Sequence, residues 1–363
     1  MNDPAHIRPI GRDNTITFLR LVIAVGVVLE HCMIFIPSVQ RALPFWIQGR
    51  MFFLIVTGML LYPLANRLTT RTGWVRFYTA RWARLAPPLV IFFALVPVVF
   101  VLFRLATVDS VLDWHLVPFI AQGFVLLPRY ELPTTAALGG VTDHLWTLVV
   151  DVTFFVLLPF LVAFARRFGF WWMIAGLSVV AVAGSVSMWC ISVYVGPSAD
   201  LAVELLHHSF AYYAYVVGGM MAAALWHRVP LGPVPVIAAA VVSVTILMVG
   251  PLVPVVYGPL KPVLLAVPLA YLVVAGARLL PRGLERFAIR IGDLSYPVYV
   301  LQGLVIIVVR FSGVDGLPAI GIVLVSTVAL AWLVTRVTTP LAVKIRTVGD
   351  AVIDRRARLG VAA

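Results

Sequence analysis

Long apolar runs dominate the chain, and polar residues gather in the short stretches between them. A helix of roughly 20 apolar residues crosses the hydrocarbon core of a bilayer. The runs are continuous and lack the alternation of lipid-facing and lumen-facing positions that barrel strands need. The pattern therefore predicts an all-α polytopic membrane protein with about ten transmembrane helices. The predicted spans are residues 16–36, 45–65, 86–103, 144–165, 171–193, 208–226, 232–250, 261–280, 294–310 and 318–337.

Three stretches outside these runs are expected not to span. Residues 66–85 are basic and aromatic, which predicts a cytoplasmic connection. Residues 104–143 form a long outer loop, and the segment LVPFIAQGFVLLP within it is too short to cross a bilayer. We expect this segment to be re-entrant or interfacial. The tail from residue 341 is basic and amphipathic, and we expect it to lie on the inner leaflet.

The composition agrees with this class of protein. Of the 363 residues, 62% are hydrophobic and only 12% are charged, and the mean hydropathy is +1.04. Soluble domains carry roughly 25% charged residues, so the composition excludes a soluble protein. No repeat, low-complexity tract or soluble domain interrupts the chain. We therefore expect a single membrane domain over residues 1–363, in which 340–363 form a cytoplasmic basic tail.

The net charge of +12 suggests nucleic acid at first, but the positions of the basic residues explain it better. With the N-terminus in the cytoplasm, 20 of the 27 Lys and Arg residues fall at inner ends or inner loops, and Arg20 lies within a span. This asymmetry follows the positive-inside rule and predicts that both termini are cytoplasmic. We expect no nucleic-acid partner, and the arginine-rich usage points to a bacterial plasma (inner) membrane. The six basic residues expected outside are Arg41, Arg50, Arg104, Arg129, Lys261 and Arg310.

The cysteines and the clustered histidines do not predict a metal site. Cys32 and Cys190 both lie in apolar segments, which argues against a disulfide framework and a metal cluster. Glu204, His207 and His208 flank the predicted start of a helix, without a further residue that completes a ligand set. We therefore expect no metal.

Ionisable residues in the first span require an explanation, because a charge in hydrocarbon costs at least a few kcal/mol. Arg20 and His31 are eleven residues apart, which on a straight helix is about 20° from three full turns and a rise of ~16 Å. Both side chains then lie on one face, with Arg20 near the inner surface and His31 inside the membrane. This arrangement suits a substrate whose phosphates stay on the cytoplasmic side while its reactive end reaches into the membrane. Alternatively, Arg20 reaches the lipid headgroups and His31 only hydrogen-bonds another helix.

Arg81 and Arg84, in the stretch RWAR, lie three residues apart at the predicted start of the third span. Residues at this spacing share a helix face. Two adjacent guanidinium groups are well suited to phosphate recognition. The alternative is that both arginines only anchor the helix on the cytoplasmic side.

Asp151 stands a few residues inside the fourth predicted span, where a carboxylate needs a partner. His31 is the favoured partner, because the two residues are expected at comparable depth from the outer surface. A carboxylate on one imidazole nitrogen fixes the tautomer and leaves the other nitrogen as a base. Glu30 competes for this role, but it points about 100° away from His31 on the helix.

The stretch GDLSYPVYVLQG, residues 292–303, places Ser295, Tyr296, Tyr299 and Gln302 at the start of the ninth span. Tyrosines at such a position are typical of an aromatic belt. The sequence gives no role to His115 or His144, which fall in the predicted outer loop or at its end. It contains no phosphate-binding Gly-rich loop, nucleophile elbow or zinc-protease helix motif.

Taken in order, five motifs resemble the acyltransferase type 3 family of membrane O-acyltransferases, and together they extend over nearly the whole chain. They are Arg-x10-His (Arg20, His31), Phe-Phe-x3-Gly with Thr before the Gly (Phe52 to Gly58), F-x3-R-x2-R-x2-P (Phe77, Arg81, Arg84, Pro87), WTLVVDVTFFVLLP (Trp146 to Pro159) and GDLSYPVYVLQ (Gly292 to Gln302). Four positions depart from the family pattern. Asp151 replaces the usual Glu, Gln302 stands where His is common, Glu30 is unusual, and Thr17 replaces an N-terminal acidic residue. These departures leave room for a distinct acceptor or a weakened enzyme.

The resemblance implies an enzyme with an acyl-CoA donor, a hydroxyl acceptor and no permanently bound cofactor. It implies that Arg20, Arg81 and Arg84 hold the anionic end of acyl-CoA. His31, oriented by Asp151, then acts as base or forms an acyl-imidazole intermediate. Trp146, Ser295, Tyr296 and Gln302 are expected to support the site.

Acceptors compatible with the family are a surface glycan, a lipid-linked sugar and a glycosylated metabolite. The competing hypothesis is a transporter in which Arg20, His31 and Asp151 form a proton or anion relay, and a third is an inactive relative kept as an assembly partner. The arginine pair and the order of the five motifs favour the enzyme.

Overall fold

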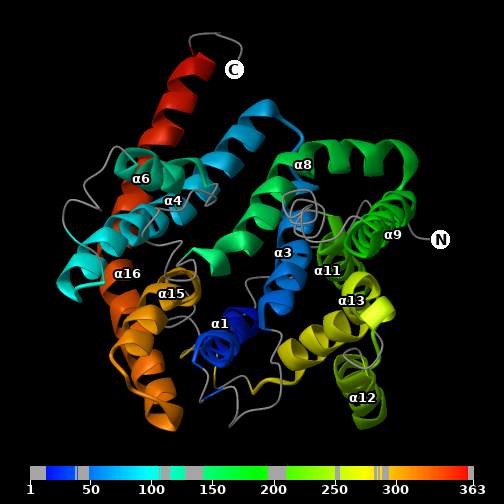
Figure 1. The fold of residues 1–363 in the computed structure, drawn as a ribbon. Coiled ribbons are helices and arrows are strands. Elements are labelled where there is room, and N and C mark those ends of the chain that lie inside the picture. Colours follow the sequence, from blue (N-terminus) through cyan, green and yellow to red (C-terminus); the bar gives the residue numbers. More distant parts are fainter. Residues whose placement is uncertain are drawn as a thin grey trace. The chain divides into compact units, whose positions relative to one another are not determined.

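The computed structural model describes residues 14–36, 39, 49–105, 107, 115–126, 142–194, 210–249, 254–281, 284, 287 and 294–358. Within these residues every regular element is a helix and none is a strand, which confirms the predicted all-α class (Figure 1). The elements are α1 (Asn14–Phe35), α3 (Gly49–Ala65), α4 (Arg71–Leu102), α6 (Leu116–Val125), the 3-10 turn η2 (Asp143–Leu145), α8 (Trp146–Phe168), α9 (Phe170–Tyr194), α11 (Tyr213–Leu225), α12 (Pro233–Val249), α13 (Pro254–Leu279), α15 (Ser295–Phe311) and α16 (Gly316–Arg358).

Each of the ten predicted spans overlaps one of these helices. Six helices are long and apolar enough to cross a membrane, namely those containing Ile16–Phe35, Arg71–Leu102, Trp146–Phe168, Phe170–Ser187, Leu260–Leu279 and Gly316–Arg355. The helices α3, α11, α12 and α15 have 17, 13, 17 and 17 residues and are shorter than a typical span. These helices indicate a membrane protein, while the number of ten crossings and the cytoplasmic termini remain predictions. At ten residues, or ~15 Å, α6 is too short to cross the ~30 Å core, as expected.

The helix α4 differs from its prediction, because it begins at Arg71 and not near residue 86. Thr70 caps its first turn, with the Thr70 hydroxyl accepting a hydrogen bond from the Gly73 amide at 3.1 Å. The predicted connection 66–85 is therefore mostly helical. Pro87 and Pro88 lie inside the helix and do not end it. Since proline has no amide hydrogen, the α-helical pattern offers no backbone donor to the carbonyls of residues 83 and 84.

The helices group into two compact units. Unit 1 consists of residues 1–23, 48–67 and 149–290, and unit 2 consists of residues 24–47, 68–148 and 291–363. The helices α1 and α8 each contribute residues to both units. The expectation of one domain over residues 1–363 remains a prediction.

In unit 1, two adjacent glycines let α11 approach two neighbours closely. A Cβ atom on Gly219 would lie 1.9 Å from the carbonyl oxygen of Ile55 in α3, and one on Gly218 would lie 2.8 Å from that of Ala266 in α13. Gly58 makes the reciprocal contact, since its Cβ would lie 2.1 Å from the Val216 carbonyl oxygen. Small residues at helix crossings are how membrane helices gain van der Waals contact in the absence of a hydrophobic driving force.

Unit 2 is built on α4, which packs against α6, α15 and α16. The Trp82 indole donates a hydrogen bond to the Phe124 carbonyl of α6 at 2.7 Å, and the Phe93 and Phe119 rings meet edge to face at 5.0 Å. These contacts give the short apolar helix α6 a fixed position on α4.

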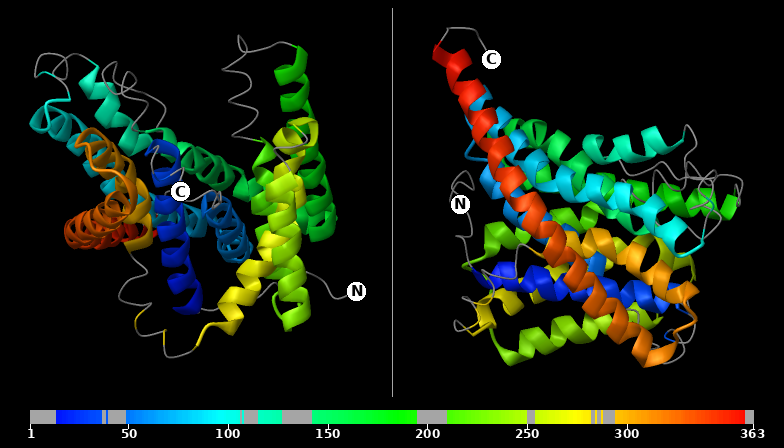
Figure 2. Two further views of the ribbon diagram at one scale, coloured as in Figure 1. Left: turned by 60° about the horizontal axis from the view of Figure 1, so that its bottom comes forward. Right: turned by 90° about the vertical axis from the view of Figure 1, so that its left-hand side faces the viewer.

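The helix α16 continues through Pro340 to Arg358 as one element, so the predicted tail from residue 341 is helical as far as 358 (Figure 2). Its C-terminal part packs on the first turns of α4, where a Cβ atom on Gly349 would lie 2.8 Å from a Thr79 methyl group. Arg76 pairs with Asp350 at 3.6 Å and also with Asp354.

We predict that Gly219→Ala destabilises the protein by at least about 1–3 kcal/mol, because the new methyl group overlaps the Ile55 carbonyl. Thermal unfolding of the purified protein in detergent measures this loss. Gly176→Ala in α9 is the matched control, since no atom lies within 4 Å of a Cβ at Gly176. The control should be as stable as the wild type or slightly more stable. Equal stability of Gly219→Ala and the wild type would show that α3 and α11 do not cross here.

Candidate active site

His31 lies in the last part of α1 and is almost completely buried, with 3% of its surface exposed. Its ring stacks on that of Phe35, one turn further along, with centroids 6.2 Å apart. Glu30 and Cys32 beside it are also buried. Arg20 is half-buried and lies on the same continuous helix, which confirms that one helix carries both residues of the Arg-x10-His motif.

A second histidine lies against His31, although sequence reasoning gave it no role. His144 stands in the turn η2 before α8, and only 4% of its surface is exposed. The His31 and His144 rings meet nearly at right angles, 74°, with centroids 5.9 Å apart. This is a favourable edge-to-face geometry for aromatic rings. The sequence placed His144 at the end of the outer loop with no special role, whereas the structure shows a buried imidazole beside the predicted base.

Three hydrogen bonds join the His144 segment to α15. The His144 Nε2 atom lies 2.9 Å from the Val300 carbonyl oxygen, and the Tyr299 hydroxyl donates to the His144 carbonyl oxygen. The Thr147 hydroxyl lies 2.7 Å from the Tyr299 hydroxyl and acts as the donor there, because Tyr299 uses its own hydrogen on His144. We call this set the α15 brace. It shows that Tyr299 is an internal structural residue and not part of an aromatic belt.

Gln302 and Ser295 of α15 are both fully buried, at 0% exposure. The Gln302 amide nitrogen donates to the Tyr299 carbonyl at 3.0 Å. The Gln302 Oε1 atom and the Ser295 hydroxyl have no hydrogen-bond partner among the described residues. Polar atoms inside a protein are nearly always paired, so these two are good candidates for contact with a bound molecule.

Arg81 and Arg84 lie on one face of α4, and both are half-buried. The Arg81 guanidinium stands 5.4 Å from the centre of the Phe77 ring, a cation–π contact that orients it. The Tyr296 hydroxyl donates to the Leu85 carbonyl at 3.0 Å and so fastens α15 to α4 beside the pair. The spacing prediction that the two arginines share a face is confirmed.

Two further residues were predicted to belong to the site, Trp146 and Asp151. Trp146 is half-buried at the start of α8. Asp151, also half-buried, belongs to unit 1 and acts electrostatically on Tyr213 of α11, whereas His31 belongs to unit 2. The pairing of His31 with Asp151 remains a prediction.

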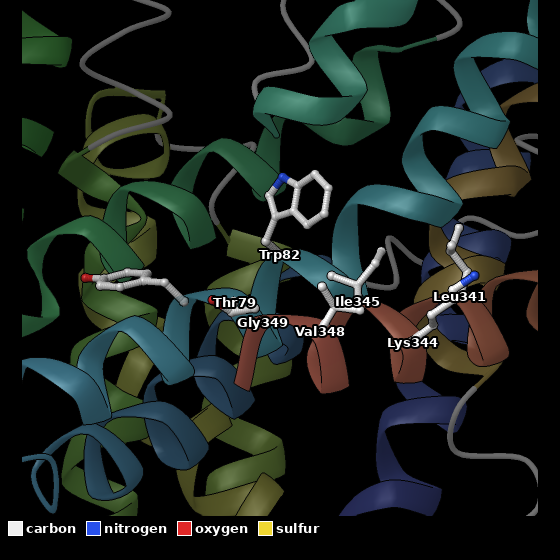
Figure 3. Close-up of a pocket in the computed structure, with 8 residues that line it drawn as sticks. Thr79, Trp82, Leu341, Lys344, Ile345, Val348 and Gly349 are labelled. Atoms are coloured by element: carbon white, nitrogen blue, oxygen red, sulfur yellow. The ribbon is translucent and has the colours of Figure 1, made fainter. Parts of the chain in front are cut away.

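A shallow groove of about 670 Å³ follows α4 and α16 in unit 2. Trp82 of α4 stands across from Ile345 and Val348 of α16 along it (Figure 3). Arg81 and Arg84 are not among its lining residues, although Tyr78, one turn before Arg81, is. Lys344 is the charged residue among its lining side chains. The groove therefore lies on the same stretch of α4 as the arginine pair but is not lined by it.

No metal centre emerges from the described part of the chain, where no three His, Cys, Asp or Glu residues are grouped closely enough to hold an ion. Glu204, His207 and His208 lie outside the described residues. Cys32 and Cys190 are both free thiols.

Comparison with known proteins identifies the family. A family model described as an acyltransferase domain matches residues 13–336. The chain is also similar to Nodulation protein 10 of Rhizobium leguminosarum bv. viciae, with 26% identity over 241 residues, which cover 62% of the chain and 64% of that protein. The chain thus matches somewhat less than two thirds of the length of this relative. No solved structure matches. Since the family match covers most of the chain and agrees with the five motifs, this membrane protein belongs to the acyltransferase type 3 family of enzymes.

Proposed function

We propose that the protein transfers an acetyl or other short acyl group from acyl-CoA to a hydroxyl group of a carbohydrate or related acceptor, with His31 as the general base. The observation that carries this proposal is the burial of the His31 imidazole on the helix that also bears Arg20. A buried imidazole can be neutral at physiological pH and can therefore accept a proton. The family match supplies the reaction class.

The proposed reaction is a direct transfer. A ring nitrogen of His31 removes the proton of the acceptor hydroxyl while the hydroxyl oxygen attacks the thioester carbonyl carbon. The carbon–sulfur bond then breaks, and the CoA thiolate takes the proton from the imidazolium. The products are an ester and free CoA, and His31 returns to its neutral state. A route through an acyl-imidazole would use the same residue as nucleophile. Asp151 enters this proposal as the group that orients His31, on sequence grounds alone.

Arg81 and Arg84, together with Arg20, are proposed to hold the phosphates of acyl-CoA. The support is their charge, their half-buried positions and the shared face of the α4 pair. Planar guanidinium groups bind phosphate oxygens through paired hydrogen bonds. The donor needs no resident cofactor in this scheme.

The acceptor is proposed to be a surface glycan, a lipid-linked sugar or a glycosylated metabolite at a bacterial plasma membrane. Gln302 and Ser295 provide buried oxygen atoms that could accept hydrogen bonds from sugar hydroxyls. Trp146 and Tyr296, which lie in two of the family motifs, are proposed to support the site. A proton or anion relay would use His31 without needing the arginine pair, and it would release no CoA.

We predict that His31→Gln lowers the rate of acyl transfer by about 10²–10⁴-fold, because the proton acceptor is lost. The measurement is release of CoA thiol from acetyl-CoA, with membranes that contain the protein supplying the hydroxyl acceptors and water serving as the acceptor for the purified protein. Folding is checked by thermal unfolding. His227→Gln is the control, since His227 is exposed on the turn after α11. A His31→Gln protein with the wild-type rate would rule out His31 as the base, and a wild type that releases no thiol would argue against the enzyme.

Replacing Arg81 or Arg84 by Ala should raise the KM for acetyl-CoA by about tenfold or more and leave kcat nearly unchanged. Each loss removes a charge-assisted hydrogen bond, worth about 1.5–3 kcal/mol, that holds the donor in ground state and transition state alike. Steady-state kinetics of thiol release measure both constants. Arg71→Ala is the matched control, because Arg71 is exposed on a different face of the same helix. If Arg71→Ala raises the KM as much as Arg81→Ala or Arg84→Ala does, the overall positive charge of the protein explains the effect and not a specific phosphate site.

Gln302→Met should reduce acyl incorporation into membrane acceptors about tenfold while hydrolysis of acetyl-CoA by water stays unchanged. The substitution keeps the volume of the side chain but removes the buried Oε1 atom, together with the amide bond to the Tyr299 carbonyl. Radiolabelled acetyl-CoA supplied to membranes that contain the protein gives both quantities. Gln122→Met, at a buried glutamine of α6, is the control. An equal fall in both quantities would mean that the substitution acts through the lost bond to Tyr299 and not through contact with the acceptor.

A further inference from the structure

We propose that His144 is a positioning residue that fixes the ring of His31 for the reaction and is itself fixed by α15. The catalytic consequence of this inference rests on the proposed function, whereas the geometry does not. All residues involved, His31, Phe92, His144, Thr147 and the α15 residues, belong to unit 2.

The first step in the argument is the contact between the two rings. His31 and His144 are both almost fully buried, and their rings meet edge to face with centroids 5.9 Å apart. Phe35 contacts the His31 ring as well, at 6.2 Å. Since water does not separate groups packed this closely, the orientation of His31 depends on where its ring neighbours are held.

The second step is the hydrogen bond made by the His144 ring. A backbone carbonyl can only accept, so Nε2 must carry a hydrogen in its 2.9 Å contact with the Val300 oxygen. Turning the ring over would break this bond and leave a buried N–H without this partner, which is unfavourable in free energy. The contact therefore fixes both the tautomer of neutral His144 and the orientation of its ring.

The third step is that the backbone of His144 is held by the same helix. The Tyr299 hydroxyl donates to the His144 carbonyl, and Thr147 donates to Tyr299. Consecutive residues of α15 thus bind the ring and the main chain of one histidine. Phe92 of α4 closes another side of the His144 ring, with centroids 5.8 Å apart and planes at 80°. His144 has little freedom to move relative to α15.

A positioning role fits this geometry better than an acid–base role. The Nε2 hydrogen of His144 is engaged with a carbonyl and is not offered to a substrate. A neutral ring beside His31 also avoids the like-charge repulsion that would oppose protonation of His31 during the reaction. His144 therefore acts through His31 and not on the substrate.

The test compares His144→Gln, His144→Asn and His144→Phe. A glutamine amide can reach the Val300 carbonyl from the position of Nε2, whereas the shorter asparagine amide cannot, and phenylalanine fills the space without a donor. We expect His144→Gln to retain most of kcat for thiol release from acetyl-CoA. The Asn and Phe variants should lose about tenfold to 100-fold in kcat, with KM unchanged, because a small displacement of a catalytic group has effects of this size. His227→Gln is the control for loss of a histidine.

Two kinetic results would overturn the proposal. A wild-type kcat in the His144→Phe protein would show that the His144 ring only fills space. A His144→Gln protein as impaired as His144→Asn would exclude positioning through the Val300 bond and point to acid–base chemistry.

A second measurement decides the geometry independently of activity. Nitrogen-15 NMR of histidine-labelled protein, with the His144 signal assigned from the Gln variant, reports which ring nitrogen carries the hydrogen. The Nε2–H tautomer is expected, and the Nδ1–H tautomer would overturn the proposal. If the wild type shows the Nε2–H tautomer but releases no CoA, the proposed function fails while the structural part of the inference stands.

Discussion

A polar group inside a membrane protein must find its hydrogen-bond partners within the protein, because the hydrocarbon core holds no water to replace them. Leaving such a group without a partner costs several kcal/mol. In unit 2 this constraint is met at the α15 brace, where Thr147, Tyr299, His144 and the Val300 carbonyl satisfy one another. These bonds offset the cost of burying the His144 imidazole, against which the His31 ring packs. The polar network therefore holds the ring that packs against the candidate base.

The same helix also reaches the region of the arginine pair. Tyr296, three residues before Tyr299, donates to the Leu85 carbonyl beside Arg84. Pro87 and Pro88 interrupt the backbone hydrogen bonding of α4 at this level. The helix α15 thus connects the part of α4 that carries two guanidinium groups with the turn that carries His144. The tyrosines of this motif, residues 292–303, are therefore not a membrane belt. They connect two parts of the candidate site.

Much of this architecture could be predicted from the sequence, for identifiable reasons. Continuous apolar runs of membrane length predict helices, because only helices and closed barrels satisfy the backbone in lipid and barrel strands need an alternating pattern; each predicted span overlaps a helix. The spacing of Arg81 and Arg84 predicts a shared face, since it depends only on helix geometry. The resemblance of five motifs likewise predicted the family that the comparisons show.

What could not be predicted depends on contacts between distant segments. His144 precedes a helix in a stretch without periodicity, so nothing local indicates that its ring meets that of His31, 113 positions earlier. A tyrosine at the start of a span is typical of an aromatic belt, and only the hydrogen-bond partners of Tyr299 show that it is internal. The start of α4 was missed because the basic and aromatic composition of residues 71–85 resembles a loop, whereas the Thr70 cap and the contacts with α16 make it a helix.

The uninterrupted course of α16 has a consequence for the environment of its two ends. At 1.5 Å per residue, its 43 residues extend over ~65 Å, about twice the thickness of a bilayer's hydrocarbon core. One end of this rod must therefore emerge into water or run along the headgroups, and the charged end, with Asp350 and Asp354, is the end suited to do so. The ion pairs that Arg76 makes there are then exposed to dissolved electrolyte. Ionic strength consequently acts on the junction of α16 with the first turns of α4, while the histidine pair remains insulated from it.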